Sequence, residues 1–250
     1  MRKYGDAVRF KDYFFSAFLK KTMEQILPPI ELRMGGKHFL DDNEFVRSAV
    51  RDVKRLRRTA GLTLESRVLD WGCGAGRLAI GIRNYFPEGR IKHYQGVDVQ
   101  EKLIDWASKN LKAPGFDFTY INTSNDRYNP LGEEVRTLAT GKSSVDIVYA
   151  YSVFSHLDEE DSAEYLKLIK NVLIDDGKAF ITCFVEENVP DWTENPEGYG
   201  PFHWKGRLHC ALFNRHHFEN LLQAAGLAVD RFQYGRETDG QSLYVLRKLC

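Results

Sequence analysis

The chain has 250 residues, 43% of them hydrophobic, and its 35 basic residues balance its 35 acidic residues. This length suits one large domain with a short appendage, and zero net charge argues against general nucleic-acid binding, which needs a basic excess or face. There is no signal-peptide pattern, no apolar run long enough to cross a membrane and no C-x-x-C pair among the four cysteines. We therefore expect a reduced, cytoplasmic protein without a membrane partner.

Residues 1–60 predict a helical extension that lies outside the core. Apolar residues recur at helical spacing from Asp12 to Ile26, and Pro28-Pro29 ends that helix. After a flexible glycine link, a second helix is expected over residues 42–59, acidic in its first turn and basic later, as the helix dipole favours. We therefore divide the chain into an N-terminal helical cap, residues 1–60, and an α/β domain, residues 61–250.

The α/β domain opens with a short apolar strand that ends in an acid and a glycine turn. Arg67–Asp70 precedes Gly72, Gly74 and Gly76, and a helical pattern then runs to about Phe86. Glycine lets the chain turn sharply and lets a ligand approach the backbone closely. The helix N-terminus that follows offers free N–H groups to a polar ligand. The stretch predicts a strand, a ligand-binding turn and a helix.

Strands and helices alternate after this turn. The expected strands are residues 94–99, 116–121, 145–151 and 179–185, and the expected helices are residues 101–111 and 160–173, with a short helix near residues 133–138. Such alternation predicts a parallel sheet with helices on both faces. Sheets of this kind bind ligands beyond the carboxyl ends of their strands.

The alternation of strands and helices is interrupted at residues 186–214, a long segment rich in aromatic residues, glycine and proline. Long connections within a compact domain are usually lids or binding loops, so we interpret the segment as a lid-like insertion. A helix over residues 215–225 and a strand pair at residues 227–234 and 242–247 are expected after it.

The spacing of the acid and the glycines bears on the cofactor. A dinucleotide site uses G-x-G-x-x-G with a pyrophosphate over the helix N-terminus. Here the pattern is Asp-x-Gly-x-Gly-x-Gly, with Asp70 two residues before the first glycine. An acid there repels pyrophosphate but suits an ammonium group. A nicotinamide-dependent oxidoreductase is therefore the less favoured alternative.

At this point the sequence resembles the class I S-adenosylmethionine-dependent methyltransferases. The matching segments are Val-Leu-Asp-Trp-Gly-Cys-Gly-Ala-Gly at 68–76, Gly-Val-Asp at 96–98, the run from Val145 to Leu157, and Leu173–Ile181. The resemblance covers residues 66–185, and residues 215–248 match its topology. It implies a Rossmann-like, doubly wound sheet, mostly parallel with a C-terminal antiparallel strand, in the order 3-2-1-4-5-7-6. Among the members of this family, the sequence is most similar to small stand-alone bacterial enzymes.

The resemblance also implies cofactor-binding residues. Asp70 and the backbone from Gly72 through Cys73 and Gly74 to Gly76 would hold the methionine end of S-adenosyl-L-methionine, and Asp98 would accept both ribose hydroxyls. The remaining candidates border the adenine or the reactive methyl group: Val99, Asn122, Thr123, Tyr151 and Ser152.

Methyl transfer of this type is an in-line displacement that leaves S-adenosyl-L-homocysteine, and a hydroxyl acceptor also needs a base. His156, just past the fourth strand, is the candidate base, with a structural role as the alternative; His203 and His209 are further candidates. No metal is expected, because Asp146 stands at the start of its strand rather than its end and the adjacent His216 and His217 could not share one metal.

The acceptor is expected to be a small molecule or a saccharide, methylated on oxygen or nitrogen. Aromatic side chains suit a planar or sugar-like acceptor, and the candidate substrate-binding residues are Phe39, Trp192, Tyr199, His203 and Trp204. A non-catalytic protein that binds S-adenosylmethionine on the same fold is the second alternative, and the oligomeric state stays open.

Overall fold

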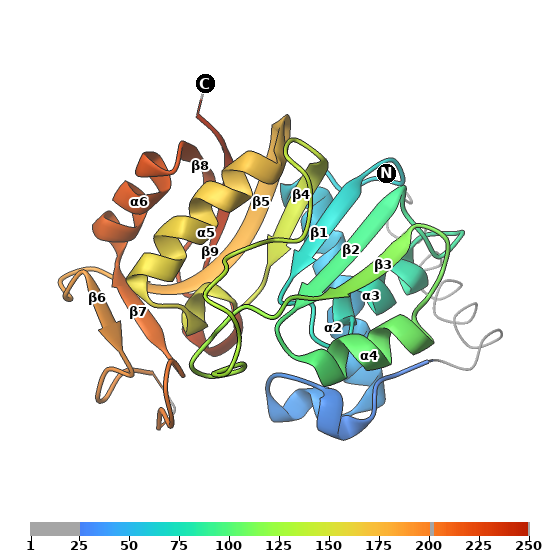
Figure 1. Ribbon diagram of the computed structural model, residues 1–250, viewed down its shortest axis with the longest axis horizontal. Coiled ribbons are helices and arrows are strands. Elements are labelled where there is room, and N and C mark those ends of the chain that lie inside the picture. The colour runs from blue at the N-terminus through green and yellow to red at the C-terminus, as the bar shows by residue number, and fades with distance from the viewer. Residues whose placement is uncertain (1–25, 201–202, 250) are drawn as a thin grey trace, which may run out of the picture.

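The computed structural model describes residues 26–200 and 203–249, so the helix expected from Asp12 lies outside the described residues. One mixed sheet organises this part of the chain (Figure 1). Its main strands are β1 (Arg67–Trp71), β2 (His93–Asp98), β3 (Phe116–Tyr120), β4 (Val145–Ala150), β5 (Leu173–Glu186), β8 (Leu227–Gln233) and β9 (Ser242–Lys248). Their spatial order is β3-β2-β1-β4-β5-β9-β8, with β9 antiparallel to both of its neighbours. The Rossmann-like order predicted from the sequence is confirmed.

Helices cover both faces of this sheet. They are α2 (Asp42–Thr59), α3 (Arg77–Tyr85), α4 (Glu101–Asn110), α5 (Glu159–Val172) and α6 (Arg215–Ala224). Figure 1 shows α5 in front of β5, α6 on the same side at the left end of the sheet, and α2 and α3 behind β1 and β2. Strand residues alternate between the two faces, so Leu69 and Val148 pack with α5, whereas Val68 and Ile147 pack with α2 and α3.

Three of the five helices, α2, α5 and α6, begin at a side chain that caps them. The Asp41 carboxylate accepts from the backbone N–H of Glu44 at 2.7 Å, and Asp158 accepts from Asp161 in the same way. Asn214 caps α6 through two backbone N–H groups. These side chains satisfy donors that a helix start leaves unpaired. Helix positions were accordingly predictable to within one or two residues.

Helix α2 differs from the expectation that residues 1–60 lie outside the core. Ala49, Val53 and Leu56 have no exposed surface and pack in the same core as α3. Gly81 on α3 makes this contact possible, because a Cβ at that position would lie 2.3 Å from the carbonyl oxygen of Ala49. Helix α2 is therefore one layer of the domain.

The segment before α2 contains two short 3-10 turns in place of a plain glycine link. They are Ile30–Leu32 and Lys37–Leu40. Arg33 joins them, since its Nε donates to the carbonyl oxygen of Pro28 and its guanidinium pairs with Asp42 at 2.6 Å. The glycine stretch is thus anchored to the start of α2.

The insertion at residues 186–214 is more ordered than a loop. It contains β6 (Trp192–Glu194) and β7 (Ala211–Asn214), which pair antiparallel, and β7 continues the sheet beside the end of β5. Figure 1 shows this pair extending beyond the helices at one side of the molecule. Apolar side chains of this segment pack on Phe184, so much of the insertion is anchored to the sheet.

Two local expectations were wrong. Residues 133–138 form no helix, because the backbone of Glu133 instead exchanges hydrogen bonds with Asn122 and Ser124. Strand β5 begins at Leu173 rather than at residue 179, and residues 174–177 form an irregularity within it, where its register against β4 shifts.

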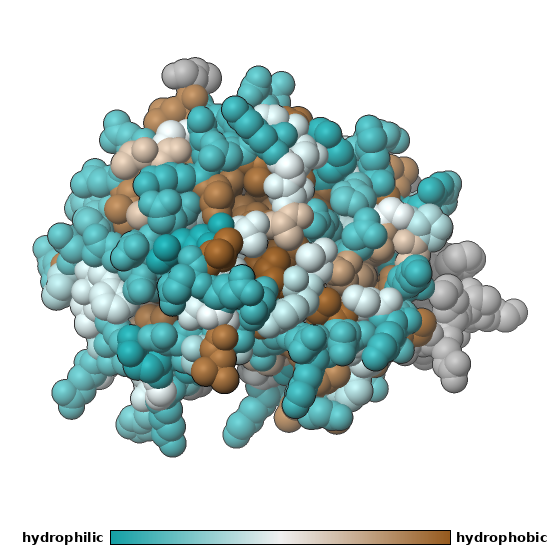
Figure 2. Space-filling view, viewed as in Figure 1, coloured by the Kyte–Doolittle hydropathy of each residue, from teal (hydrophilic) through white to brown (hydrophobic). Residues whose placement is uncertain are grey.

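The surface is mainly polar. In the view of Figure 2 hydrophilic residues dominate, and apolar residues occur in small separate groups. Leu131 is the most exposed of the large apolar residues described, at 94%. Within residues 26–200 and 203–249 no helix has the length and apolar character needed to span a membrane.

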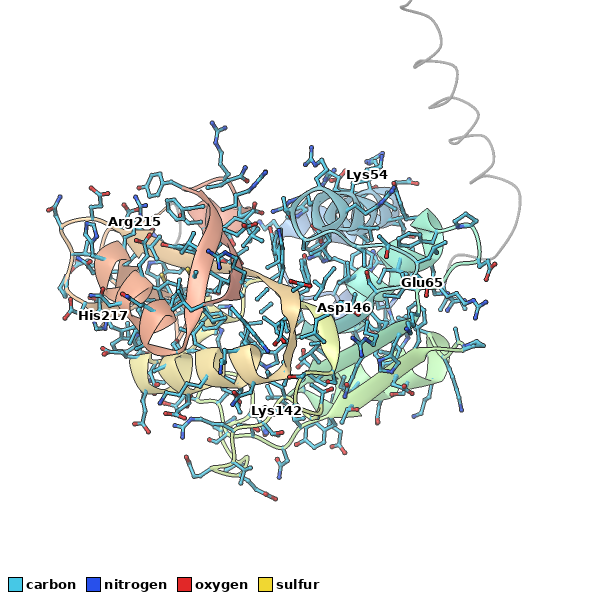
Figure 3. The ribbon with its side chains drawn as sticks, turned by 90° about the horizontal axis from the view of Figure 1, so that it is seen from above. Lys54, Glu65, Lys142, Asp146, Arg215 and His217 are labelled. Carbon is cyan, nitrogen blue, oxygen red and sulfur yellow. The ribbon has the colours of Figure 1, made fainter. Side chains whose placement is uncertain are left out.

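Asp146 and His217, both labelled in Figure 3, have structural partners. The Asp146 carboxylate accepts from the backbone N–H of Arg67 at 2.7 Å and pairs with its guanidinium at 2.9 Å, which joins the starts of β1 and β4. His217 on α6 pairs with Glu159 on α5 at 3.0 Å. In the described part of the chain, no three His, Cys, Asp or Glu side chains are grouped closely enough to hold a metal.

Candidate active site

A cavity of about 590 Å³ lies beyond the carboxyl ends of β1, β2 and β4. The strand ends and the glycine turn form one wall, and the 3-10 segment before α2 forms another. The rest of the cavity wall comes from three segments, residues 124–128, 203–209 and 238–241. Cavities of this size commonly hold cofactors and small ligands. This position is where open parallel sheets bind ligands.

Asp98 at the end of β2 is held ready to accept hydrogen bonds. Its Oδ2 accepts from the backbone N–H of Gly74 at 2.8 Å, and its Oδ1 accepts from that of Gln100 at 2.9 Å. Burial raises the pKa of Asp98, and these backbone donors partly offset the rise. Each oxygen has a lone pair left for a hydroxyl in the cavity. A ribose diol fits this carboxylate.

Asp70 at the end of β1 is buried beside Tyr94. The Tyr94 hydroxyl donates to Asp70 Oδ2 at 2.5 Å, which leaves Oδ1 for a ligand. Burial raises the pKa of Asp70 to about 7, although the bond from Tyr94 and the charge of Arg77 act against the rise. A cationic ligand would recover the cost of ionising this group, because an opposite charge nearby favours the carboxylate.

The glycines of the turn have distinct tasks. Gly72, Gly74 and Gly76 all take positive φ angles, of 74°, 56° and 80°, which glycine adopts without strain. Gly72 and Gly74 line the cavity. Gly76 does not, and a Cβ there would lie 2.4 Å from Cδ1 of Leu111. The third glycine therefore serves the packing of α3 against α4.

A buried hydroxyl beside Asp70 has no partner among the described residues. Tyr149 is the register partner of Asp70 on β4, so both side chains lie on the same face of the sheet. Its hydroxyl is buried without a hydrogen bond in the described part of the chain, although Tyr149 lines the cavity. The Arg77 guanidinium, which pairs with Asp52, lies in the same region. Buried polar atoms normally have partners, so a ligand group that accepts a hydrogen bond fits here.

These features fit S-adenosylmethionine. Asp98 suits the ribose of this cofactor, and Asp70 suits its ammonium group. Tyr149 and Arg77 together suit its carboxylate. The acids also complement its positive charge.

The chain after β4 is fixed by a polar network. Ser152 takes a positive φ of 59°, which is strained for a residue other than glycine. The Thr182 hydroxyl accepts from the Ser152 backbone N–H at 2.7 Å, and Gln241 Nε2 donates to the Ser152 hydroxyl at 2.8 Å. Gln241 is 1% exposed and also accepts from Thr182. This network sets the path of the chain into the turn that carries His156.

His156 ends the short 3-10 turn Phe154–His156. Its Nδ1 lies 2.9 Å from the carbonyl oxygen of Leu208. Because a carbonyl only accepts, Nδ1 carries the proton and Nε2 keeps a lone pair. Burial lowers the pKa of His156 to about 4, so its ring is neutral at neutral pH. Tyr128 packs edge-on against it at 5.3 Å between ring centroids.

The wall around His156 is basic and aromatic. Arg127, His203, Trp204 and His209 line this part of the cavity. The Trp204 and His209 rings lie 5.3 Å apart, and Trp204 also packs on Phe184 at 5.7 Å. His209 Nδ1 accepts from the backbone N–H of Lys205 at 2.9 Å. The cavity thus has an acidic half at Asp70 and Asp98 and a basic half at Arg127 and the histidines.

Most residues singled out from the sequence are brought together in this cavity. They are Phe39, Asp70, Gly72, Cys73, Gly74, Asp98, Val99, Tyr151, Ser152, His156, His203, Trp204 and His209. Gly76 belongs to the same turn but packs against Leu111 instead of lining the cavity.

Four predicted residues lie away from the cavity lining. Asn122 is exposed and accepts from the Tyr120 hydroxyl, and the Thr123 hydroxyl donates to the carbonyl oxygen of Val135. Trp192 packs against the main core, and the Tyr199 hydroxyl donates to Glu186 at 3.1 Å. Ser124 and Asn125 line the cavity where Asn122 and Thr123 were expected.

Several lining residues were missed. Arg77 follows the last glycine directly, and Tyr149 lies two residues before the predicted Tyr151, so position in the motif was an available signal. Arg127, Tyr128 and Asp239 lie in irregular segments. Only the tertiary structure brings these three residues to the cavity.

The sequence and the fold match known methyltransferases. Residues 41–231 match the family model described as "Methyltransferase domain". O-methyltransferase rstn1 of Aspergillus nomiae is 27% identical over 195 residues, which cover 76% of this chain and 78% of that protein.

Solved structures share the fold at low identity. Burkholderia thailandensis 1,6-didemethyltoxoflavin-N1-methyltransferase, with 1,6-didemethyltoxoflavin and S-adenosylhomocysteine bound, superposes with a TM-score of 0.56 at 16% identity, covering 100% of this chain and 93% of that one. The [4+2]-cyclase SpnF superposes with a TM-score of 0.58 at 15% identity, covering 81% and 82%.

The match to the family model spans well over half of the chain, and the acid-glycine turn, Asp98 and the strand order agree with it. The chain belongs to the methyltransferase domain family and is a class I S-adenosylmethionine-dependent methyltransferase.

Proposed function

We propose that this protein methylates an oxygen of a planar small-molecule acceptor. The observation that supports the proposal is that the neutral His156 lines the same cavity as Asp70 and Asp98 and keeps a lone pair on Nε2. The O-methyltransferase relative supports oxygen as the acceptor atom. Flat aromatic walls at Tyr128 and Trp204 support a planar acceptor over an extended saccharide.

In this proposal the acidic half holds the cofactor. Asp98 binds the ribose hydroxyls and Asp70 the ammonium group, while Tyr149 and Arg77 bind the carboxylate. Bound S-adenosylmethionine supplies an electrophilic methyl group on a sulfonium. These four residues would hold the cofactor in one orientation beside the acceptor space, which would lower the entropic cost of bringing the reacting atoms together.

His156 acts as the base. As the acceptor oxygen forms its bond to the methyl carbon, the carbon–sulfur bond breaks and its electron pair stays on sulfur. The acceptor proton moves to His156 Nε2, while the Leu208 carbonyl keeps the ring in place through Nδ1. General bases of this kind contribute roughly 100-fold to 10,000-fold.

The remaining segments have supporting roles in this proposal. Residues 30–40 cap the cavity through Phe39, which is 9% exposed and packs on Phe45. Residues 203–209 of the insertion form the lid over the basic half. These two segments shape the acceptor space.

The test combines binding and turnover. Calorimetry with S-adenosylmethionine and S-adenosylhomocysteine comes first, because absence of binding would refute the assigned cofactor site. A panel of phenols, hydroxybenzoates, amines and sugars is then screened for release of S-adenosylhomocysteine. Methyl ethers of the aromatic members are the expected products; transfer only to nitrogen, or only to sugars, would contradict the proposal.

His156→Asn tests the base. The asparagine amide can still donate to the Leu208 carbonyl, but it has no Nε2. On the best acceptor of the panel we expect kcat to fall about 100-fold or more, with unchanged affinity for S-adenosylhomocysteine. Full activity of this variant would rule out an essential base at this position.

A further inference from the structure

Arg127 is a cation without an acidic partner in the basic half of the cavity. Its Nε is buried and has no hydrogen bond within residues 26–200 and 203–249. The neighbouring acid Asp126 pairs with Arg207 at 2.8 Å instead. No ion pair of Arg127 occurs in the same described ranges. The side chain as a whole is partly exposed, but a buried donor atom without a partner is costly. An anionic ligand that accepts from Nε would remove this cost.

Hydrogen bonds hold both the backbone and the side chain of Arg127 in place. Asn125 Oδ1 accepts from the backbone N–H groups of Arg127 and Tyr128 at 3.1 and 3.0 Å, and Asn125 Nδ2 donates to the carbonyl oxygen of His156 at 3.0 Å. The loop that carries Arg127 is therefore tied directly to the candidate base. The guanidinium is fixed at its other end, because Nη1 donates to the carbonyl oxygens of Lys205 and Arg207.

The other cations of the cavity are already paired. Arg33 binds Asp42 and Arg77 binds Asp52. Asp239 also lines the cavity, on the turn between β8 and β9, where its charge interacts with His38 and His209. Arg127 is the remaining cavity-lining arginine in the described residues, and it lies on the acceptor side.

The neighbours of Arg127 restrict the shape of the ligand. Its guanidinium carbon lies 5.4 Å from the centroid of the Tyr128 ring. Tyr128 also meets His156, and Trp204 meets His209 on the opposite segment. A flat ring between such walls would place a carboxylate against the edge of the guanidinium that carries the unpartnered Nε.

We propose that Arg127 is the acceptor-recognition residue and that the acceptor is a planar hydroxyl compound that also carries a carboxylate. This inference rests on the proposed function and adds the substrate class to it. The carboxylate binds Arg127, and the hydroxyl to be methylated faces His156. Selectivity arises because a carboxylate accepts from the buried Nε and neutralises the charge of Arg127, whereas an amide supplies no negative charge.

The experiment uses the full chain saturated with S-adenosylhomocysteine at about pH 7 and constant ionic strength. Dissociation constants are measured by calorimetry or ligand-observed NMR for 3-hydroxybenzoate and 3-hydroxybenzamide, which differ in one charged group. We expect the carboxylate to bind the wild-type protein at least tenfold more tightly than the amide. A carboxylate that binds no better than the amide, or that does not bind, overturns the proposal.

Two variants locate the effect. Arg127→Met should abolish the preference for the carboxylate, and Arg127→Lys should restore part of it, because lysine keeps the charge but loses the bidentate geometry. Arg231→Met is the matched control: it removes the same charge from an exposed residue of β8 that does not line the cavity. It should leave the preference intact. A preference that survives in Arg127→Met overturns the assignment.

The affinity for S-adenosylhomocysteine separates this inference from the proposed function. All three variants should bind it as the wild-type protein does, which also shows that they fold. Failure of wild-type binding would refute the proposed function, whereas intact cofactor binding without discrimination between the two probes would refute only the role of Arg127.

Discussion

The two halves of the cavity are built in different ways. The acidic half consists of strand ends and a glycine turn, where Asp70 and Asp98 are fixed by sheet register and by backbone or tyrosine donors. The basic half consists of three irregular segments that meet only in the folded chain, at residues 124–128, 203–209 and 238–241. A fixed cofactor half and a variable acceptor half allow one fold to serve many acceptors.

The halves also differ in charge, which gives each a distinct ligand. A cofactor with a positive charge suits the acids, and an electron-rich acceptor suits Arg127 and the neutral His156. Substitutions in one half should therefore leave binding to the other half unchanged.

The largest expected effect is in the acidic half. Asp98→Asn should weaken S-adenosylhomocysteine by about 100-fold or more, because two hydrogen bonds to a carboxylate contribute roughly 3–6 kcal/mol together. Calorimetry should show the same loss for 5′-methylthioadenosine, which keeps the ribose but lacks the amino-acid group. The exposed Asp105 on α4 supplies the control variant Asp105→Asn. Unchanged affinity in Asp98→Asn would refute the ribose assignment.

The next effect depends on pH. Because the pKa of Asp70 is raised to about 7, a cationic ligand must displace its proton below that pH. Affinity for S-adenosylhomocysteine should therefore fall by about tenfold for each pH unit below 7 and level off above it. Asp70→Asn should remove this dependence. A flat pH profile in the wild-type protein would contradict the role of Asp70.

The same group affects stability in the opposite direction. The folded protein binds the Asp70 proton more tightly than the unfolded chain, whose carboxyl pKa is about 3.9. The contribution of Asp70 to stability is therefore complete below about pH 4 and is lost as the pH rises through about 7. Denaturant unfolding of wild-type protein and Asp70→Asn across this range should show that difference.

A smaller effect distinguishes the two ends of the cofactor. Tyr149→Phe removes only a hydroxyl, so S-adenosylhomocysteine should bind about tenfold more weakly, a loss of roughly 1.4 kcal/mol. The affinity for 5′-methylthioadenosine should not change. Tyr120→Phe, outside the cavity, is the matched control. Equal losses for both ligands would mean that Tyr149 acts on the fold rather than on the carboxylate.

The smallest effect is expected at a residue that the sequence placed in the acceptor site. The Tyr199 hydroxyl donates to Glu186 and its ring packs on Phe184, outside the cavity lining. Tyr199→Phe should leave the affinities for cofactor and 3-hydroxybenzoate within about twofold of wild type, since surface-type changes rarely exceed 0.5 kcal/mol. A large loss of 3-hydroxybenzoate binding would show that Tyr199 does belong to the acceptor site.

Short-range patterns in the sequence predicted which strand-end residues lie together in the acidic half. Apolar runs that end in acids located Asp70 and Asp98, and helix caps such as Asp41 set the helix starts. The sequence missed Arg127 because a position within an irregular loop has no periodicity. Trp192 was misplaced for a related reason: an aromatic residue in an insertion can pack on the core as readily as line a site. Residues 133–138 were also misread, since backbone pairing with residues 122–124 overrode helix propensity.

The most direct test of the two-half account is a crystal structure with S-adenosylhomocysteine and 3-hydroxybenzoate. We predict that the ribose hydroxyls bind Asp98 and that the carboxylate of S-adenosylhomocysteine lies near Tyr149 and Arg77. The sulfur should be open toward His156, and the carboxylate of the benzoate should bind Arg127. Adenosine bound among Arg127 and the histidines, or a sulfur that faces a closed wall, would contradict it.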